Sequence, residues 1–102
     1  MSDVMQSIKF NTIEVPNRFA LAPMTRTSAE PDGTPNALMA DHYERYARGG
    51  FGLVITEGTY TDGKASQGYA NQPGIINEAQ IDGWKTIVER VHAAGRKIIV
   101  QL

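Results

Sequence analysis

Apolar and polar residues alternate in two short segments near the start of the chain, residues 8–10 and 13–15. A tight turn between the two segments pairs Ile8 with Val15 and places their apolar side chains on one face. This alternation is typical of half-buried strands. The pattern therefore predicts a small antiparallel hairpin at the start of the fold.

Three longer runs are apolar almost throughout, as expected of strands that are covered on both faces. They span residues 18–22, 51–56 and 97–102. Pro23 ends the first run, because proline has no N–H group to donate to a sheet.

The segment between the first two runs has apolar residues at helical spacing, which predicts a helix. We expect this helix to begin near Thr34, with Thr34 as the cap and Pro35 at the first helical position, and to end at Gly49-Gly50. Its charged residues favour two pairs four positions apart, Asp41–Arg45 and Glu44–Arg48. Its predicted apolar stripe consists of Leu38, Met39, Tyr43, Tyr46 and Ala47.

A second helix is predicted between the last two runs. Asn77 followed by Gln80 is close to a capping box, and Gly95 is the stop signal. The apolar stripe of this helix consists of Ile81, Trp84, Ile87, Val88 and Val91. The predicted order is a hairpin followed by β-α-β-α-β, which indicates an α/β fold with a parallel sheet and right-handed crossovers.

The connections between these elements are unequal in length. The predicted helices return to strands through Gly49-Gly50 and Gly95-Arg96, whereas the strands lead to helices through residues 25–35 and 58–76. In parallel βα folds, the loops that follow the carboxyl ends of strands build the functional site. We therefore expect site residues at positions 22–25, 56–58 and 101.

The last apolar run leaves a predicted strand without a following turn or covering helix. Three strands and two helices expose an open edge, and complete (β/α)8 barrels contain about 250 residues. We interpret residues 1–102 as the first part of one such domain. We also expect that the chain does not form a stable monomer by itself.

Composition excludes several other functions. The chain has 10 basic and 11 acidic residues and no cysteine, which argues against nucleic-acid binding, disulfides and the usual zinc sites. His42 and His92 are predicted on helix surfaces without ligand-spaced carboxylates, so no metal site is expected. No apolar segment reaches the roughly 20 residues of a membrane span, and we expect a cytoplasmic protein without membrane contact.

Five motifs occur in a fixed order: Asn17-Arg18-Phe19-Ala20-Leu21-Ala22-Pro23-Met24-Thr25-Arg26, Ile55-Thr56-Glu57-Gly58-Thr59, Gly68-Tyr69-x-x-x-Pro73-Gly74, Gln80-Ile81-x-x-Trp84-Lys85 and Val100-Gln101-Leu102. Together they resemble the old yellow enzyme family, from about Ile8 to Leu102. The resemblance implies the N-terminal portion of an FMN-containing (β/α)8 barrel, a TIM barrel, whose lower end is capped by the hairpin. It also implies hydride transfer from NADH or NADPH to activated alkenes, such as α,β-unsaturated carbonyl or nitro compounds.

By this resemblance, five residues contact FMN: Pro23, Met24, Thr25, Gly58 and Gln101. A hydroxyl donor at Thr25 suits the C4 carbonyl and N5 region of the flavin, and the Gln101 amide suits its pyrimidine edge. Gly58 allows the backbone to approach the ring closely. Tyr69 lies near the mouth of the substrate pocket. The family's substrate-gripping and proton-donating residues lie on later strands, so no catalytic residue is expected in this segment.

The leading hypothesis is an NAD(P)H-dependent ene-reductase to which this chain contributes part of the FMN site. The isolated chain is then predicted to be inactive. The alternative is a non-catalytic barrel fragment that assembles with a complementary polypeptide, and a barrel fragment that serves another ligand remains a third possibility. Glu57 is expected to hold neighbouring loops by accepting backbone hydrogen bonds rather than to act as an acid or base.

Overall fold

The chain folds into a layered α/β arrangement in a computed structural model that describes residues 2–102. A short 3-10 helix, Ser2–Met5, precedes an antiparallel hairpin of β1 (Ile8–Phe10) and β2 (Ile13–Val15). A parallel sheet follows in the order β3-β4-β5. The remaining elements are β3 (Ala20–Leu21), α1 (Ala37–Arg48), β4 (Leu53–Ile55), α2 (Glu78–Ala93) and β5 (Lys97–Ile99).

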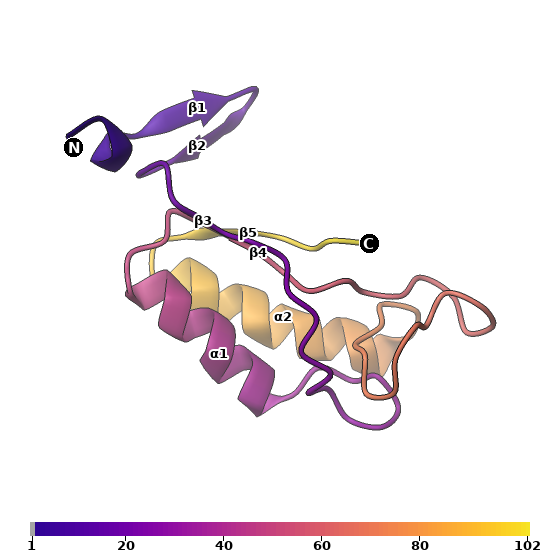
Figure 1. Cartoon of the computed structure of the whole chain (residues 1–102). Helices are drawn as coiled ribbons and strands as arrows, with labels where there is room; N and C mark the ends of the chain where they lie inside the picture. Colours follow the sequence, from indigo (N-terminus) through magenta and orange to yellow (C-terminus); the bar gives the residue numbers. More distant parts are fainter. Residues whose placement is uncertain (1) are drawn as a thin grey trace.

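Both helices cover the same face of the parallel sheet, and the hairpin stands beyond the amino-terminal ends of its strands (Figure 1). The predicted element order and the hairpin register are confirmed, since Ile8 pairs with Val15. The three parallel strands are shorter than the apolar runs that predict them. Beyond residue 55, the backbone of β4 leaves regular pairing, although Thr56 N–H still donates to the Ile99 carbonyl at 2.9 Å.

The N-cap of α1 lies two residues later in the chain than predicted. Asn36 is the N-cap and its side-chain oxygen accepts from Met39 N–H at 3.0 Å, so the prediction of Thr34 as cap and Pro35 as first helical residue is wrong. The Thr34 backbone N–H instead donates to Asp32 Oδ1 at 3.0 Å, which places Thr34 in the preceding turn. The Asn36 amide also donates to the Ser28 carbonyl, which ties the helix start to the preceding loop.

The buried face of α1 differs from the predicted apolar stripe at Leu38 and Ala40. Leu38 is 60% exposed although the sequence predicts it in the apolar stripe, and Ala40 is buried in its place. The predicted Glu44–Arg48 pair forms at 2.5 Å. Asp41 pairs with Arg90 of α2 instead of Arg45, because the two helices pack side by side and offer a partner across the interface.

Helix α2 follows its prediction more closely. Asn77 caps it by accepting from Gln80 N–H at 2.9 Å, and Gly95, with φ +78°, follows its last residues in the left-handed conformation that glycine adopts readily. The Gln80 side chain accepts from Ile76 N–H rather than from the cap residue, so the reciprocal half of the capping box does not form.

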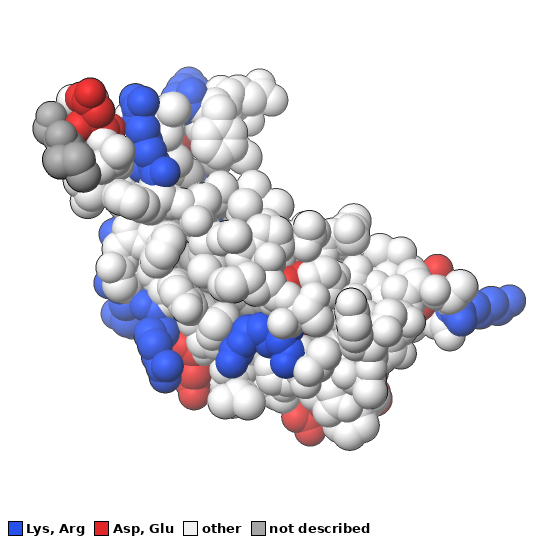
Figure 2. All heavy atoms as spheres, in the orientation of Figure 1, with Lys and Arg blue, Asp and Glu red and all other residues white. Residues whose placement is uncertain are grey.

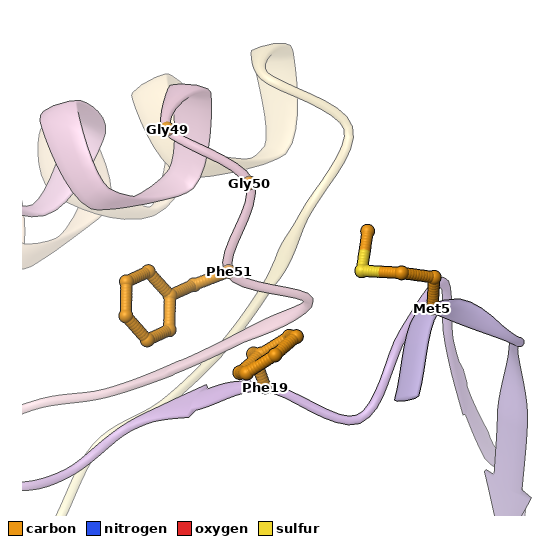
Figure 3. A pocket seen from close by; sticks show the side chains of 5 residues that line it. All are labelled: Met5, Phe19, Gly49, Gly50 and Phe51. Carbon is orange, nitrogen blue, oxygen red and sulfur yellow. The ribbon is translucent and has the colours of Figure 1, made fainter. Parts of the chain in front are cut away.

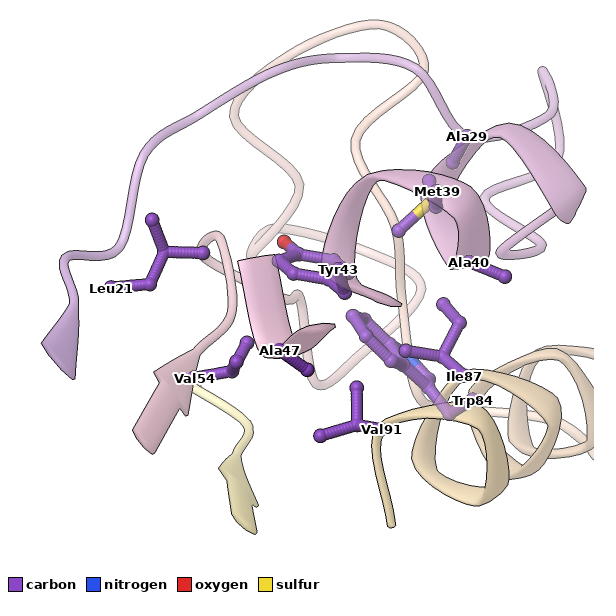
Figure 4. Packing of buried hydrophobic residues seen from close by; sticks show 10 residues of the cluster. All are labelled: Leu21, Ala29, Met39, Ala40, Tyr43, Ala47, Val54, Trp84, Ile87 and Val91. Carbon is purple, nitrogen blue, oxygen red and sulfur yellow. The ribbon is translucent and has the colours of Figure 1, made fainter. Parts of the chain in front are cut away.

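The core lies between the sheet and the two helices (Figure 4). Tyr43 and Trp84 pack from facing helices with ring centroids 6.5 Å apart. Fully buried Val54 supports them from the central strand. The buried cluster consists of Leu21, Ala29, Met39, Ala40, Tyr43, Ala47, Val54, Trp84, Ile87 and Val91.

The other face of the sheet has no helix over it among the described residues. Ala20 and Ile99 are exposed there, and the surface between the hairpin and the helices is largely uncharged in Figure 2. Neither described helix has the length and apolarity that a membrane span requires.

Candidate functional site

The carboxyl ends of the three parallel strands bring the predicted cofactor residues to one edge of the sheet. Thr25 follows β3, Gly58 follows β4 and Gln101 follows β5. Gln101 Oε1 lies 3.9 Å from the point where a Cβ atom on Gly58 would stand. Gly58 and Gln101 are therefore neighbours, as expected of residues that follow adjacent parallel strands.

The three predicted residues that follow β3 are all exposed, namely Pro23, Met24 and Thr25. Within residues 2–102, none of them makes a hydrogen bond to Gly58 or Gln101. The Met24 side chain is 48% exposed although it is large and apolar. The Met24 side chain, the Thr25 hydroxyl and the Gln101 carboxamide thus make no hydrogen bonds within residues 2–102 that would occupy them.

Thr56 lies within the expected site positions 56–58, although the sequence analysis gave it no specific contact. It is fully buried, and its hydroxyl donates to the Glu57 carbonyl at 2.9 Å while accepting from Gln101 N–H at 3.1 Å. Thr59 N–H donates to the Gln101 carbonyl at 2.9 Å. The backbone of Gln101 is thereby held against the end of β4. A hydroxyl at the end of an apolar run is the signal that could have identified Thr56.

Glu57 is buried beside the same edge, and its bond differs from the predicted backbone contacts. Its Oε2 accepts from the Tyr43 hydroxyl at 2.6 Å, and Tyr43 in turn accepts from Glu57 N–H at 2.9 Å. Burial raises the pKa of Glu57. Burial and the neighbouring carboxylate also raise the pKa of Tyr43. The pair links α1 to the residue just before Gly58, which stiffens this part of the edge.

Tyr69 lies in the long loop that follows Gly58, and its side chain is 58% exposed. The Gln72 side chain connects the two residues. Its Nε2 donates to the Gly58 carbonyl at 3.0 Å, and its Oε1 accepts from Tyr69 N–H at 3.3 Å. The structure thus joins the predicted substrate-side residue to the predicted cofactor-side glycine through a residue that the sequence analysis left unassigned.

A buried polar cluster holds the two long loops together. Gln80 Nε2 donates to the Tyr60 hydroxyl at 2.9 Å and to the Asp32 carbonyl at 3.0 Å. Trp84 Nε1 donates to the Gly74 carbonyl at 3.0 Å. Because α2 supplies Gln80 and Trp84, both loops are fixed to the same helix.

An apolar hollow of about 340 Å³ lies elsewhere, beside the turn that leads from α1 to β4 (Figure 3). It is lined by Met5, Phe19, Gly49, Gly50 and Phe51. These side chains offer no titratable or hydrogen-bonding group for chemistry, and they lie at the amino-terminal side of the strands. The strand-end edge therefore remains the candidate site.

Groups of three or more His, Asp or Glu side chains with metal-binding geometry do not occur in the described part of the chain. His42 packs edge-to-face against Tyr43 and Tyr46, with ring centroids 5.0 Å apart in each pair. The His42 ring is therefore packed against two aromatic rings.

Comparison with known proteins adds evidence that is independent of this geometry. Residues 3–102 match the model of the NADH:flavin oxidoreductase / NADH oxidase family. Chanoclavine-I aldehyde reductase from Penicillium roqueforti is 42% identical over 102 residues, which cover 100% of this chain and 27% of that protein. A probable flavin mononucleotide-dependent alkene reductase from Leishmania infantum is 36% identical over 88 residues, 86% of this chain and 23% of that protein.

The fold agrees with these matches. The crystal structure of old yellow enzyme from Pichia sp. AKU4542 superposes with a TM-score of 0.90 at 35% identity, covering 98% of this chain and 26% of that one. The chain thus spans about a quarter of the length of the proteins that it matches. It corresponds to part of an old yellow enzyme (β/α)8 barrel, and it belongs to the NADH:flavin oxidoreductase / NADH oxidase family.

Proposed function

We propose that this chain contributes the strand-end edge of an FMN site in a (β/α)8 barrel that reduces activated alkenes with NADH or NADPH. The observation that carries the proposal is the convergence of Met24, Thr25, Gly58 and Gln101 at the carboxyl ends of adjacent parallel strands. Membership of a flavin oxidoreductase family supports it. The name of the related alkene reductase from Leishmania infantum indicates the reaction class.

The residues at this edge fit a flat, partly polar ring. At Gly58, the atoms nearest to the position of a Cβ are 3.9 Å away, which is ordinary van der Waals contact without overlap. Exposed Met24 offers an apolar surface next to the hydroxyl of Thr25. The Gln101 carboxamide supplies one donor group and one acceptor, which is what a pyrimidine edge with alternating N–H and carbonyl groups requires.

Each residue then has a separate task. Pro23 and Met24 would contact the ring through the backbone and the side chain, and the Thr25 hydroxyl would supply a hydrogen-bond donor suited to negative charge on the flavin. Gln101 orients the pyrimidine edge. Tyr69 stands at the mouth of the substrate pocket. Bound FMN supplies the hydride-transfer chemistry, which no side chain of this segment provides.

We expect the activity to require the remaining strands of the barrel, because the family resemblance assigns the residues that grip the alkene and donate a proton to it to later strands. A complementary polypeptide that carries those strands is the proposed partner, and the chain without it is expected to be inactive. Exposed apolar side chains support such a partner, since Ile99 and Phe19 are 39% and 45% exposed. They equally support the second candidate function, a non-catalytic module whose role is assembly.

An FMN titration separates these two functions. This chain is combined with the remaining barrel segment of the Pichia old yellow enzyme, and FMN binding is followed by quenching of flavin fluorescence. Oxidation of NADPH with 2-cyclohexenone as acceptor then measures turnover. Binding and turnover by the assembly, with neither in the separate chains, support the enzyme. Assembly without FMN binding supports the non-catalytic module.

A glycine variant tests the predicted placement of the cofactor. Gly58→Ala should leave the fold unchanged, because its new methyl group meets no atom of the chain closer than 3.9 Å. The same methyl group would occupy the space proposed for FMN, and overpacking of about 1–3 kcal/mol predicts FMN affinity about tenfold to a hundredfold weaker. Gly63→Ala, in the same loop but at 3.5 Å from Ile76 Cδ1, is the matched control. Equal FMN affinity of both variants contradicts the placement.

A further inference from the structure

The carboxamide of Gln72 makes three hydrogen bonds that join two parts of the candidate site. Its Nε2 donates to the Gly58 carbonyl at 3.0 Å. Its Oε1 accepts from Gly68 N–H at 2.7 Å and from Tyr69 N–H at 3.3 Å. One half-buried side chain therefore uses both of its polar ends, one toward the end of β4 and one toward the loop that presents Tyr69.

The backbone of Tyr69 depends heavily on this residue. The Tyr69 carbonyl accepts from Gln72 backbone N–H at 3.2 Å, in addition to the bond from Tyr69 N–H to the Gln72 side chain. The Tyr69 side chain itself is 58% exposed and has little packing to fix it. The position of this ring is thus set mainly through its backbone.

Gln72 is itself firmly placed. It precedes buried Pro73, whose carbonyl accepts from Tyr60 N–H at 3.1 Å. The next residue, Gly74, forms an isolated parallel β-bridge with Tyr60. A Cβ on Gly74 would lie 2.4 Å from the Tyr60 ring, so the backbone here packs closely against a buried side chain. The Gln72 side chain, which we call the tether, therefore connects a closely packed backbone segment at Pro73 and Gly74 to the segment that carries the exposed Tyr69 ring.

Gly58 stands between two carboxamides. The position of its absent Cβ is 3.9 Å from Gln101 Oε1 and also 3.9 Å from Gln72 Nε2. If Gln101 faces the cofactor, Gln72 approaches the same residue from the loop that carries Tyr69. A displacement of Gln72 would therefore change the distance between the Tyr69 segment and the Gly58 edge.

We propose that Gln72 is a positioning residue that fixes Tyr69 relative to Gly58 and thereby sets the substrate-side wall of the site. This inference rests on the proposed function, in which Gly58 borders FMN and Tyr69 borders the substrate. Gln72 touches neither ligand. It acts by holding a loop in one geometry, and preorganised loops of this kind govern substrate affinity more than cofactor affinity.

Two substitutions separate the ends of the tether. Gln72→Glu keeps an acceptor for Gly68 and Tyr69 N–H but replaces the donor to the Gly58 carbonyl with an oxygen. Gln72→Met removes both polar ends at similar length. Gln6→Glu is the matched control, because the exposed Gln6 side chain makes no hydrogen bond within residues 2–102 and lies in the segment before β1, whereas Gln67 Nε2 donates to the Tyr69 carbonyl at 3.0 Å.

The first measurement is amide hydrogen exchange of the FMN-free assembly of this chain with the remaining barrel segment. Loss of the Oε1 acceptor in Gln72→Met should speed exchange at Gly68 and Tyr69 by about tenfold, as expected for a hydrogen bond of about 1–1.5 kcal/mol. Gln72→Glu should retain most of the protection at these two amides. Equal exchange at Gly68 in the wild type and Gln72→Met overturns the tether, whether the common rate is slow or fast.

The second measurement uses the FMN-loaded assembly with the remaining barrel segment and 2-cyclohexenone as the alkene. Gln72→Glu should raise KM for the alkene about tenfold, the equivalent of one lost hydrogen bond, and leave kcat and FMN affinity within about twofold. Gln6→Glu should leave KM unchanged. An unchanged KM in Gln72→Glu overturns the positioning role, and so does a loss of FMN affinity that accounts for the whole effect. A wild-type assembly that binds no FMN contradicts the proposed function instead, and the exchange comparison still decides the tether.

Discussion

Removing one buried hydroxyl, in Tyr43→Phe, should destabilise the fold through two groups at once. The hydroxyl donates to Glu57 Oε2 at 2.6 Å and accepts from Glu57 N–H at 2.9 Å, and both residues are about 2% exposed. A buried polar group that loses its partner costs about 1–3 kcal/mol. Two such groups predict a loss of at least about 2 kcal/mol in the free energy of unfolding.

The loss should also depend on pH. Burial raises the pKa of Glu57, so its folded-state pKa lies above its unfolded-state value and the carboxylate form disfavours folding. The contribution of Glu57 to stability is therefore greatest at low pH and falls as pH rises through the folded pKa. Because the Tyr43 hydroxyl stabilises the carboxylate, its removal raises this pKa further. The cost of Tyr43→Phe should thus be larger at pH 8 than at about pH 4.

Urea unfolding followed by tryptophan fluorescence measures this cost directly. Trp84 is the single tryptophan of the chain, and its ring centroid lies 6.5 Å from that of Tyr43. Tyr46→Phe is the matched control, since within residues 2–102 the Tyr46 hydroxyl makes no hydrogen bond and its ring packs against His42 and Phe51. A loss below about 0.5 kcal/mol, or one equal to that of the control, would refute the reasoning.

Three further substitutions test other parts of the structure. Asn36→Ala should cost about 1–2 kcal/mol in urea unfolding because it removes the cap of α1, whereas Thr34→Ala should cost little; the reverse order would restore Thr34 as the cap. Gly74→Ala should lower Tm by several degrees because its Cβ would lie 2.4 Å from the Tyr60 ring, and an unchanged Tm contradicts that contact. His42 has a pKa lowered first by burial and then by nearby arginines, so its contribution to stability is present above its unfolded pKa and is lost as pH falls. Between pH 7 and about pH 5, the free energy of unfolding should therefore fall more in the wild type than in His42→Gln. An equal fall in both proteins would contradict the lowered pKa of His42.

Local patterns in the sequence predict much of the fold. The alternation in the hairpin fixes its register at Ile8 and Val15, and Asn77 caps α2 as expected. Errors arise where two local signals compete, as at Thr34 and Asn36. Both residues can cap a helix, and Asn36 is held at the cap by bonds from its amide to Glu30 Oε2 and to the Ser28 carbonyl. The contact with Ser28 spans eight positions through an irregular loop, so no periodic pattern reveals it.

The same reasoning explains what was found and missed at the candidate site. Gly58 and Gln101 are predicted as neighbours because residues that follow adjacent parallel strands meet at one edge, and the structure brings them together. Thr56 is expected at this edge, but its bond to Gln101 N–H, 45 positions away, is seen only in the structure. Gln72 carries no such signal, since its role depends on a hydrogen bond to a backbone group 14 positions away. Polar side chains that bridge irregular segments become visible only when the loops are placed in space.

Native mass spectrometry tests the central claim most directly, because one spectrum reports which chains associate and whether flavin stays bound. The sample contains this chain, the remaining barrel segment of the Pichia old yellow enzyme and FMN. The account predicts a species with one copy of each polypeptide and one FMN, and loss of the FMN in Gly58→Ala. A complex of the two polypeptides without FMN, under conditions in which the intact Pichia enzyme retains it, would contradict the claim that the strand-end edge forms part of a flavin site.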